Sequence, residues 1–268
     1  MTASGVRHLA KAIASVRGAD TIGWIWQRLT SVLEGIFNLK TIGFLGGMSW
    51  QSSAQYYRIA NEFTKSSLGG HNNARSLLLT LNFHEIEELQ HKNAWNDLGQ
   101  ILQKAAQQLE VGGADFIVLC TNTMHKLATE IEQAVSIPLL HIADPTAEEI
   151  QSRGLQTVGL LGTKFTMEEA FYRERLETKH NLSVIIPEQA DRDIVHHVIY
   201  EELCHGRVVE RSRNEFQRII EELQHRGAQA VILGCTEIEL LVRQEDSCLP
   251  LFDTTALHAR AAVRLAAL

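Results

Sequence analysis

The chain has 268 residues and a formal net charge of −7, with 45% hydrophobic and 21% charged residues. This composition is typical of a globular protein with a substantial core, and the length fits one large or two modest domains. The acidic balance, without any aromatic-basic stripe, gives no reason to expect binding to nucleic acid.

The cysteines and histidines give no sign of a metal site. Four cysteines are widely spaced without a Cys-x-x-Cys pair, and His196, His197 and His205 share an expected helix at a spacing that does not suit a metal. No secretory signal is evident, so reduced thiols in a cytoplasmic protein are the simplest interpretation.

Residues 1–39 are expected to form an amphipathic N-terminal extension. Apolar side chains recur at helical spacing over 6–16 and again over 22–36. Arg28 and Glu34 interrupt the second stretch, which is too short and too polar to span a bilayer. We expect the extension to pack on the body or to be loosely ordered, with docking to a partner protein or a membrane surface as alternatives.

Apolar runs bounded by glycine alternate with longer helical stretches from Lys40 onward. In chain order, strands are expected at 41–46, 76–82, 115–120, 138–142, 157–162, 183–186, 230–234 and 250–252. Helices are expected at 51–66, 95–111, 123–134, 145–152, 166–178, 191–205, 208–226 and 255–267. Fully apolar strands alternating with helices predict an α/β fold whose parallel sheets are covered on both faces.

Segments of the body recur in the same order and at nearly the same spacing, which predicts two pseudosymmetric, doubly wound domains. The matched pairs are 41–46 with 157–162, 113–121 with 227–235, and 137–140 with 249–252. We expect a first domain of 40–144 plus about 253–268 and a second domain of 145–252. Ligands bind beyond the carboxyl ends of the strands in such folds, so we expect an active site in the interdomain cleft.

A glycine-rich turn, Gly43-Phe44-Leu45-Gly46-Gly47-Met48-Ser49, follows the first expected strand. Its spacing does not match the dinucleotide-binding fingerprint. Gly46 and Gly47 either let main-chain amides approach a small anion or serve only a tightly packed turn.

Cys235 follows an apolar strand and precedes Thr236-Glu237. A thiol acts as a base only when it can form thiolate, and its unperturbed pKa is ~8.5. The start of a helix after the strand is expected to lower that pKa, which places Cys235 where activation is possible. A cysteine simply buried in the core is the alternative.

Cys120 and Thr121 end the matching strand of the first repeat, and adjacent strand residues point to opposite sides. A gapped alignment pairs Cys120 with Cys235, whereas the gapless alignment pairs Thr121 with Cys235. We prefer the gapless alignment because it preserves strand register, which a one-residue slip would reverse. Thr121 is then expected to face the cleft, with Cys120 buried behind it.

The residues that follow these strands, Thr121-Asn122-Thr123 and Thr236-Glu237, supply hydroxyls, an amide and a carboxylate at expected helix starts. Such residues cap helices, and the same groups can bind a substrate anion.

Together these residues resemble the aspartate/glutamate racemase superfamily, specifically its cofactor-independent amino-acid racemase branch. The resemblance covers residues 40 to about 268. It rests on Thr41–Trp50 (TIGFLGGMSW), Cys120–Lys126 (CTNTMHK) and Gly234–Ile238 (GCTEI), with support from 82–86 and 161–163. It implies a homodimer that racemises an amino acid without pyridoxal or another cofactor. One thiolate would remove the Cα proton and a group on the opposite face would return one.

The chain departs from the common family pattern at Thr121-Asn122-Thr123, where many members have Cys-Asn-Thr. A threonine hydroxyl is far less acidic than a thiol, so Thr121 is a poor base, although it could donate or relay a proton. The hypothesis is that Cys235 abstracts the proton from the L isomer and that Thr121 lies on the reprotonation face. Turnover would then favour L to D.

A second departure concerns the substrate side chain. Aspartate-specific relatives can place an arginine where this chain reads Glu87-Glu88-Leu89-Gln90. Gln90 could serve instead, and Arg207 is a candidate distal cation. We expect aspartate or glutamate as substrate. The expected substrate-binding residues are Met48, Ser49, Gln90, Asn122, Thr123, Thr163, Arg207, Thr236 and Glu237.

Several alternatives stay open at this point. Relatives on the same scaffold isomerise maleate, decarboxylate arylmalonates or racemise hydantoins, and a broad-specificity racemase fits the same motifs. Loss of the first cysteine also fits a non-catalytic protein that binds an acidic amino acid. A third possibility is a pathway enzyme docked to a larger synthase through its N-terminal extension.

Overall fold

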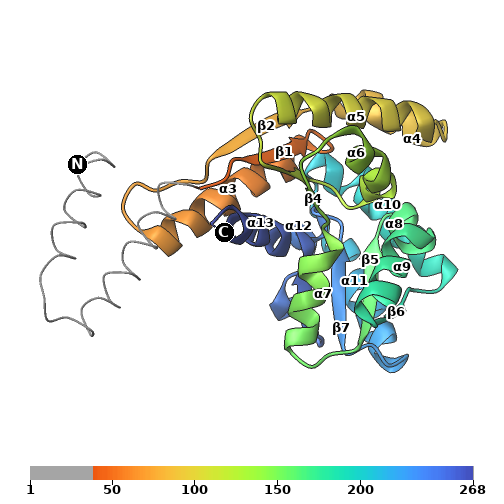
Figure 1. Ribbon diagram of the computed structural model, residues 1–268. Coiled ribbons are helices and arrows are strands. Elements are labelled where there is room, and N and C mark those ends of the chain that lie inside the picture. The colour runs from red at the N-terminus through yellow and green to blue at the C-terminus, as the bar shows by residue number, and fades with distance from the viewer. Residues whose placement is uncertain (1–38, 268) are drawn as a thin grey trace, which may run out of the picture.

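The computed structural model of the protein describes residues 39–267 (Figure 1). The predictions made for the N-terminal extension, 1–39, therefore fall almost entirely outside the described residues. None of the helices in the described part of the chain has the length and apolar character that a membrane crossing requires.

The strands of residues 39–267 form two four-stranded sheets, and every strand pair is parallel. The first sheet has the order β2-β1-β3-β4 and comprises β1 (Ile42–Gly46), β2 (Ser76–Thr80), β3 (Phe116–Leu119) and β4 (Leu139–Leu140). The second has the order β6-β5-β7-β8 and comprises β5 (Thr157–Gly162), β6 (Ser183–Ile185), β7 (Ala230–Gly234) and β8 (Leu251–Asp253). The predicted α/β class with parallel sheets is confirmed.

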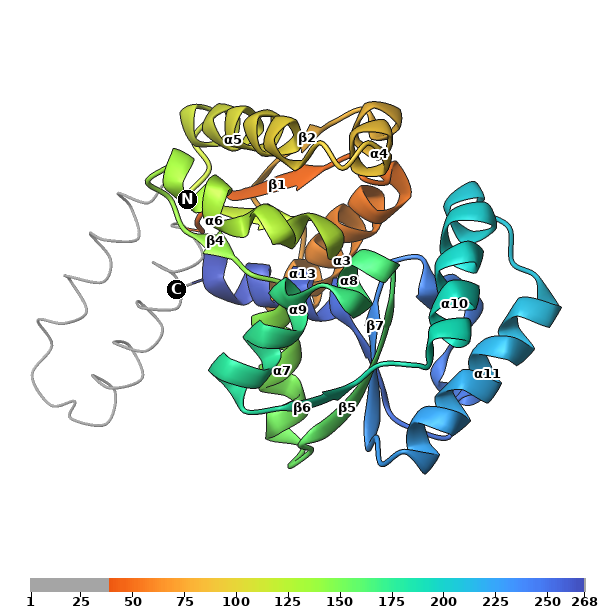
Figure 2. The ribbon, with the colours of Figure 1, turned by 90° about the vertical axis from the view of Figure 1, so that its right-hand side faces the viewer.

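Helices flank both sheets, as two views at right angles show (Figures 1 and 2). They are α3 (Trp50–Leu68), α4 (Phe83–His91), α5 (Trp95–Val111), α6 (Ala128–Ala134), α7 (Ala143–Ser152), α8 (Lys164–Glu168), α9 (Ala170–Glu174), α10 (Gln189–Glu201), α11 (Glu210–His225), α12 (Ile238–Leu241) and α13 (Thr254–Ala266). Short 3₁₀ turns η1 (Thr123–Leu127), η3 (Leu203–His205) and η4 (Gln244–Asp246) and a π turn, η2 (Arg175–Lys179), complete the chain.

All eight expected strands are present, with small shifts at their ends. Helices α4 and α12 were not expected. Only Ile86 and Gln90 of α4 are buried, so its apolar periodicity is weak, and α12 is a single turn. The helix expected at 166–178 is divided, because Glu169 takes an extended conformation between α8 and α9.

The internal repeat is present in the register of the two sheets. Gly43 of β1 pairs with Ile117 of β3, and Gly159 of β5 pairs with Val231 of β7. Thr121 follows Ile117 at the same distance along the chain as Cys235 follows Val231. The strand pairing therefore agrees with the gapless alignment, in which Thr121 matches Cys235.

Strand alternation divides the core of the first sheet into two buried layers. Phe116, Val118 and Cys120 belong to the cluster beneath α3 and α13, whereas Ile117 and Leu119 belong to the cluster beneath α5 and α6. Successive side chains of a strand point to opposite faces, so the two layers follow from the apolar sequence of β3. Helix α13, at the end of the chain, lies beside α3 (Figure 1).

A buried cluster of three histidines lies at the meeting point of α3, α13 and β4. The Nε2 atom of His258 donates to the main-chain oxygen of Leu140 at 2.8 Å, and the Tyr56 hydroxyl donates to His258 Nδ1 at 2.8 Å. The rings of His125 and His141 lie 4.4 Å apart. Burial lowers the pKa of His141 to about 3 and that of His258 to about 4, and it holds the pKa of His125 well below its usual range.

We expect these histidines to make stability depend on pH below neutrality. Each folded-state pKa lies below the unfolded value of ~6.5, so the unfolded chain binds more protons and stability is lost as pH falls from about 6.5 toward 4. The loss should approach about 1.4 kcal/mol per pH unit for each histidine. Urea unfolding at about pH 7, 6 and 5 measures the slope.

The matched variants are His258→Gln, which should reduce the slope, and His71→Gln at an exposed position, which should leave it unchanged. Equal slopes in both variants and the wild type would assign the pH dependence to other groups.

Candidate active site

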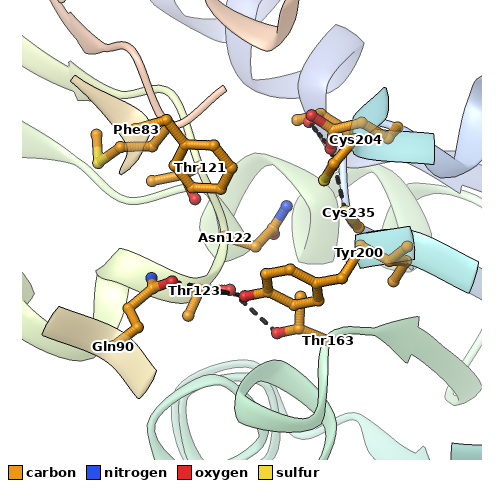
Figure 3. Close-up of a pocket in the computed structure, with 14 residues that line it drawn as sticks. Phe83, Gln90, Thr121, Asn122, Thr123, Thr163, Tyr200, Cys204 and Cys235 are labelled. Carbon is orange, nitrogen blue, oxygen red and sulfur yellow. Dashed lines mark hydrogen bonds between the residues drawn. The ribbon is translucent and has the colours of Figure 1, made fainter. Parts of the chain in front are cut away.

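A pocket opens at the carboxyl ends of the two sheets, and elements around both sheets line it (Figure 3). Elements around the first sheet contribute Met48, Phe83, Gln90, Thr121, Asn122 and Thr123. Elements around the second sheet contribute Thr163, Ile199, Tyr200, Cys204, Gly234, Cys235, Thr236 and Glu237. Most of the residues predicted from sequence therefore meet in one place.

The buried carboxylate of Glu237 accepts hydrogen bonds from three side chains. Ser49 Oγ donates to Oε1 at 2.5 Å, while Thr236 Oγ1 and Cys235 Sγ donate to Oε2 at 2.5 Å and 3.1 Å. Ser49 lies at the start of α3, after β1, and the other two follow β7. Glu237 thus joins the loops of the two sheets and directs the thiol of Cys235.

The surroundings of the Cys235 thiol hold it in its protonated form. Burial raises its pKa well above the usual value, and the nearby Glu237 carboxylate and Cys204 raise it further. The expectation that a helix start would lower this pKa is wrong here. Helix α12 is a single turn, and it begins after the acidic side chain of Glu237 rather than at the thiol.

Thr121 and Cys120 lie on opposite sides of the same segment. Thr121 lines the pocket, whereas Cys120 is fully buried in the cluster beneath α3 and α13, and its Sγ donates to the Val118 main-chain oxygen at 3.6 Å. Burial also raises the pKa of the Cys120 thiol well above its usual value. The predicted orientation of this pair is confirmed, and Cys120 is separated from the pocket.

Asn122 presents an unpartnered oxygen in the wall of the pocket. Its Nδ2 donates to Thr254 Oγ1 at 3.0 Å, and the Thr254 hydroxyl donates in turn to the Leu233 main-chain oxygen at 2.8 Å. The Oδ1 atom of Asn122 is buried and accepts no hydrogen bond from the described residues. Buried acceptors are normally paired, so this atom is available to a ligand donor.

Hydroxyls from both sides of the pocket meet at Thr123 and Thr163. Their Oγ1 atoms lie 3.1 Å apart, and the Thr166 hydroxyl lies 3.3 Å from that of Thr163. Thr163 also caps α8 by accepting from the Thr166 main-chain nitrogen. Capping and lining the pocket are therefore compatible roles for the same side chain.

Gln90 and Tyr200 bridge the pocket at another side (Figure 3). The Tyr200 hydroxyl donates to Gln90 Oε1 at 3.5 Å, and Gln90 Nε2 contacts Met124 Sδ at 3.1 Å. Burial raises the pKa of Tyr200, which keeps its phenol neutral. Burial likewise raises the pKa of Cys204 to about 12.

Sequence reasoning missed four of the lining side chains: Phe83, Ile199, Tyr200 and Cys204. Phe83 follows Asn82 in a segment that supports the family resemblance, but it has no partner in the internal repeat to mark it as a site residue. The other three lie on α10 and η3, where the signal was an ordinary helical pattern.

Three expectations differ from the structure. Ser49, expected to bind substrate, is absent from the described pocket lining and donates to Glu237 instead. Arg207 is exposed, donates to the Glu201 main-chain oxygen and is absent from the described pocket lining. The amide of Gly47 donates to Ser53 Oγ at 2.7 Å, so the glycine turn does not offer it to an anion. A Cβ at Gly47 would lie 2.2 Å from the Leu81 main-chain oxygen, which shows that close packing requires this glycine.

Fold and site together define an α/β protein with two similar parallel sheets and a pocket lined by thiols, hydroxyls and a carboxylate. The sequence profile of the Asp/Glu/hydantoin racemase family matches residues 45–262, and the chain belongs to that family. It is an isomerase of the racemase type.

Individual relatives agree with this assignment. A provisionally assigned Asp/Glu racemase from Yersinia pestis is 51% identical, with a TM-score of 0.80 over 85% of this chain and 99% of that one. An aspartate racemase homologue from Pyrococcus horikoshii is 33% identical, with a TM-score of 0.75 over 85% and 100%. The broad-specificity amino-acid racemase RacX of Bacillus subtilis is 27% identical over 83% of this chain and 96% of its own length.

We expect Glu237→Gln to lower the pKa of the Cys235 thiol, because the substitution removes a negative charge that helps to keep it high. Alkylation of Cys235 with iodoacetamide, followed across pH by mass spectrometry, should give a midpoint at lower pH than in the wild type. The matched control is Glu239→Gln, which neutralises a carboxyl two positions after Glu237 that makes no hydrogen bond to the thiol. This variant should leave the midpoint unchanged. A midpoint that stays or rises in Glu237→Gln would contradict this electrostatic account.

Proposed function

We propose that this protein racemises an acidic amino acid without a cofactor, by proton abstraction at Cys235 and reprotonation from the wall that carries Thr121. The observation that carries the proposal is the placement of these two residues. They occupy matching positions at the ends of β3 and β7, and both line the same pocket. Two opposed acid–base groups are what inversion at a carbon centre requires.

Activation of Cys235 follows from its contact with Glu237. The carboxylate lies 3.1 Å from the sulfur, so it can accept the thiol proton when a substrate arrives. The ammonium group of an amino acid would fit between Glu237 and the unpartnered Asn122 Oδ1. Its positive charge would favour thiolate over thiol in the same small space.

The thiolate then takes the Cα proton of the L isomer and becomes a thiol again, leaving a planar carbanion. The hydroxyls of Thr123 and Thr163 are candidates to hold the α-carboxylate and the charge that spreads onto it. The Thr121 hydroxyl gives a proton to the opposite face of the carbanion and regains one from a water molecule. The hydroxide that remains takes the proton that Glu237 accepted, so Glu237 returns to its carboxylate form. The product is the D isomer, and the proton balance closes.

The preference for an acidic substrate is supported by the relatives and by neutral donors in the pocket. Gln90 directs one amide hydrogen to Met124, which leaves a second for a side-chain carboxylate, and the Tyr200 hydroxyl adjoins it. The only charged side chain among the described lining residues is Glu237. That balance favours a broad-specificity racemase as the second candidate, consistent with the similarity to RacX.

Substitutions at the three candidate positions test the proposal. We expect Cys235→Ala to abolish racemisation of L-aspartate and L-glutamate, and Cys120→Ala to retain it because Cys120 lies outside the pocket. Thr121→Ala should lower D-isomer formation, whereas Thr121→Cys should raise the kcat from the D isomer. Chiral chromatography measures both directions.

Exchange of the Cα proton in deuterium oxide separates catalysis from binding alone. Wild-type protein that binds L-aspartate without exchange or racemisation would make this a binding protein. Equal kcat values from both isomers, together with loss of activity in Cys120→Ala, would contradict the assignment of Thr121 and Cys235.

The side-chain end of the pocket gives a separate prediction. We expect Gln90→Leu and Tyr200→Phe to raise the KM for aspartate and glutamate roughly tenfold, because a carboxylate loses a hydrogen-bond donor. The KM for alanine should stay within about twofold, since alanine reaches neither group. Tyr57→Phe, at an exposed position on α3, is the matched control. If the KM values for alanine and aspartate rise by the same factor, the side-chain carboxylate of the substrate does not bind at Gln90 and Tyr200.

A further inference from the structure

We propose that His125 is a positioning residue that holds the Thr121-Asn122-Thr123 segment in place opposite Cys235. The proposal rests on the function proposed above, because it assigns to one buried imidazole the placement of the reprotonating wall. His125 is 2% exposed and is not among the described residues that line the pocket. It therefore acts on the reaction only through its neighbours.

The imidazole of His125 bridges two main-chain groups from different parts of the first sheet. Its Nδ1 lies 2.7 Å from the main-chain oxygen of Thr121, and the main-chain nitrogen of Ile142 donates to its Nε2 at 3.2 Å. An amide nitrogen can only donate, so Nε2 must be unprotonated and Nδ1 must carry the hydrogen. Both bonds therefore require one neutral tautomer.

Burial maintains that neutral form. Removal from water lowers the pKa of His125 well below its usual range, and the neighbouring rings of His141 and His258 act in the same direction. The ring of His258 lies 6.0 Å from that of His125. The bridge is thus permanent at the pH values where thiol chemistry operates.

The Thr121 main chain needs this support because the sheet no longer provides it. Strand β3 ends at Leu119, and the pairing of β3 with β1 ends at the same residue. Beyond it, the carbonyl of Thr121 has the His125 ring as its partner. A buried carbonyl is costly to leave unpaired, so the imidazole fixes where the segment turns.

Within residues 39–267 the Thr121 side chain makes no hydrogen bond, and only its main-chain nitrogen and oxygen do. By contrast, Cys235 is directed by a side-chain bond to Glu237. The position of the Thr121 hydroxyl is therefore set by the main chain, which the hydrogen bond to His125 fixes.

Two amide substitutions separate the two bonds of the imidazole. The side-chain nitrogen of asparagine takes the place of Nδ1, so His125→Asn can still donate to Thr121. The longer glutamine reaches the place of Nε2, so His125→Gln can accept from Ile142 and loses the Thr121 bond. His258→Gln, which removes an equally buried imidazole bonded to Leu140 and Tyr56, controls for general destabilisation.

The readout is the ratio of D-isomer formation to Cα deuterium exchange in the remaining L-aspartate. We expect His125→Gln to lower this ratio about tenfold or more, because Cys235 still removes and returns the proton while the opposite wall is misplaced. His125→Asn should stay within about threefold of the wild type. His258→Gln should lower the melting temperature and leave the ratio unchanged.

A purely structural role would lower exchange and racemisation by the same factor, or would affect the Asn and Gln variants equally, and either result overturns the proposal. Amide hydrogen exchange gives a readout that needs no activity. Protection of residues 121–124 should fall in His125→Gln and persist in His125→Asn, and equal protection in both also overturns it. Wild-type protein without exchange or racemisation of any amino acid refutes the proposed function, while the protection data still decide the role of the imidazole.

Discussion

The hydrogen bonds to the buried carboxylate of Glu237 are the interactions on which the pocket depends. A charged group removed from water is costly unless several donors satisfy it, and Glu237 has three. One of them, Ser49, comes from the loop after β1, whereas Glu237 and Cys235 follow β7. The need to satisfy one carboxylate therefore brings loops of both sheets together and also orients the sulfur.

The same carboxylate helps to explain why Cys235 is a thiol and not a thiolate. Burial of a thiol disfavours thiolate, and a neighbouring anion disfavours it further. Reactivity then depends on what enters the pocket, because a substrate ammonium would offset the charge of Glu237. A thiol that is weakly acidic without substrate is also protected from oxidation and alkylation, since thiolate is the reactive form.

Much of the architecture could be predicted from the sequence. Apolar runs marked all eight strands, and strand alternation was enough to separate Thr121 from Cys120. These features are local, since each depends on residues adjacent in the chain. The repeat also includes Gly43 and Gly159, where a larger side chain would lie too close to Ala114 and to Leu223 of α11, respectively.

The rest of the site depends on contacts between distant residues. Tyr200 and Cys204 enter the pocket because of how α10 and η3 pack, which an ordinary helical pattern does not reveal. The raised pKa of Cys235 results first from burial and then from the Glu237 carboxylate. The sequence encodes neither the burial of the thiol nor the direction of the Glu237 side chain, although Glu237 is only two positions away. The prediction that Arg207 lies in the site was wrong because the sequence does not encode the direction of its side chain. A cation near a helix end can face either the pocket or solvent.

Thermodynamics limits how far the kinetics of the two enantiomers can differ when Cys235 and Thr121 act on opposite faces of the substrate. Enantiomers have equal free energies in water, so their equilibrium constant is unity and kcat/KM must be the same in both directions. A thiol on one face and a hydroxyl on the other can therefore make kcat larger from the L isomer only if KM for that isomer is larger in proportion. Unequal walls imply unequal ground-state binding of the two isomers. The contacts that can distinguish them are those fixed in space around Cα, the unpartnered Asn122 oxygen and the Glu237 carboxylate. In the proposed mechanism, the direction of turnover would then depend on the groups proposed to bind the ammonium as much as on the proposed acid–base pair.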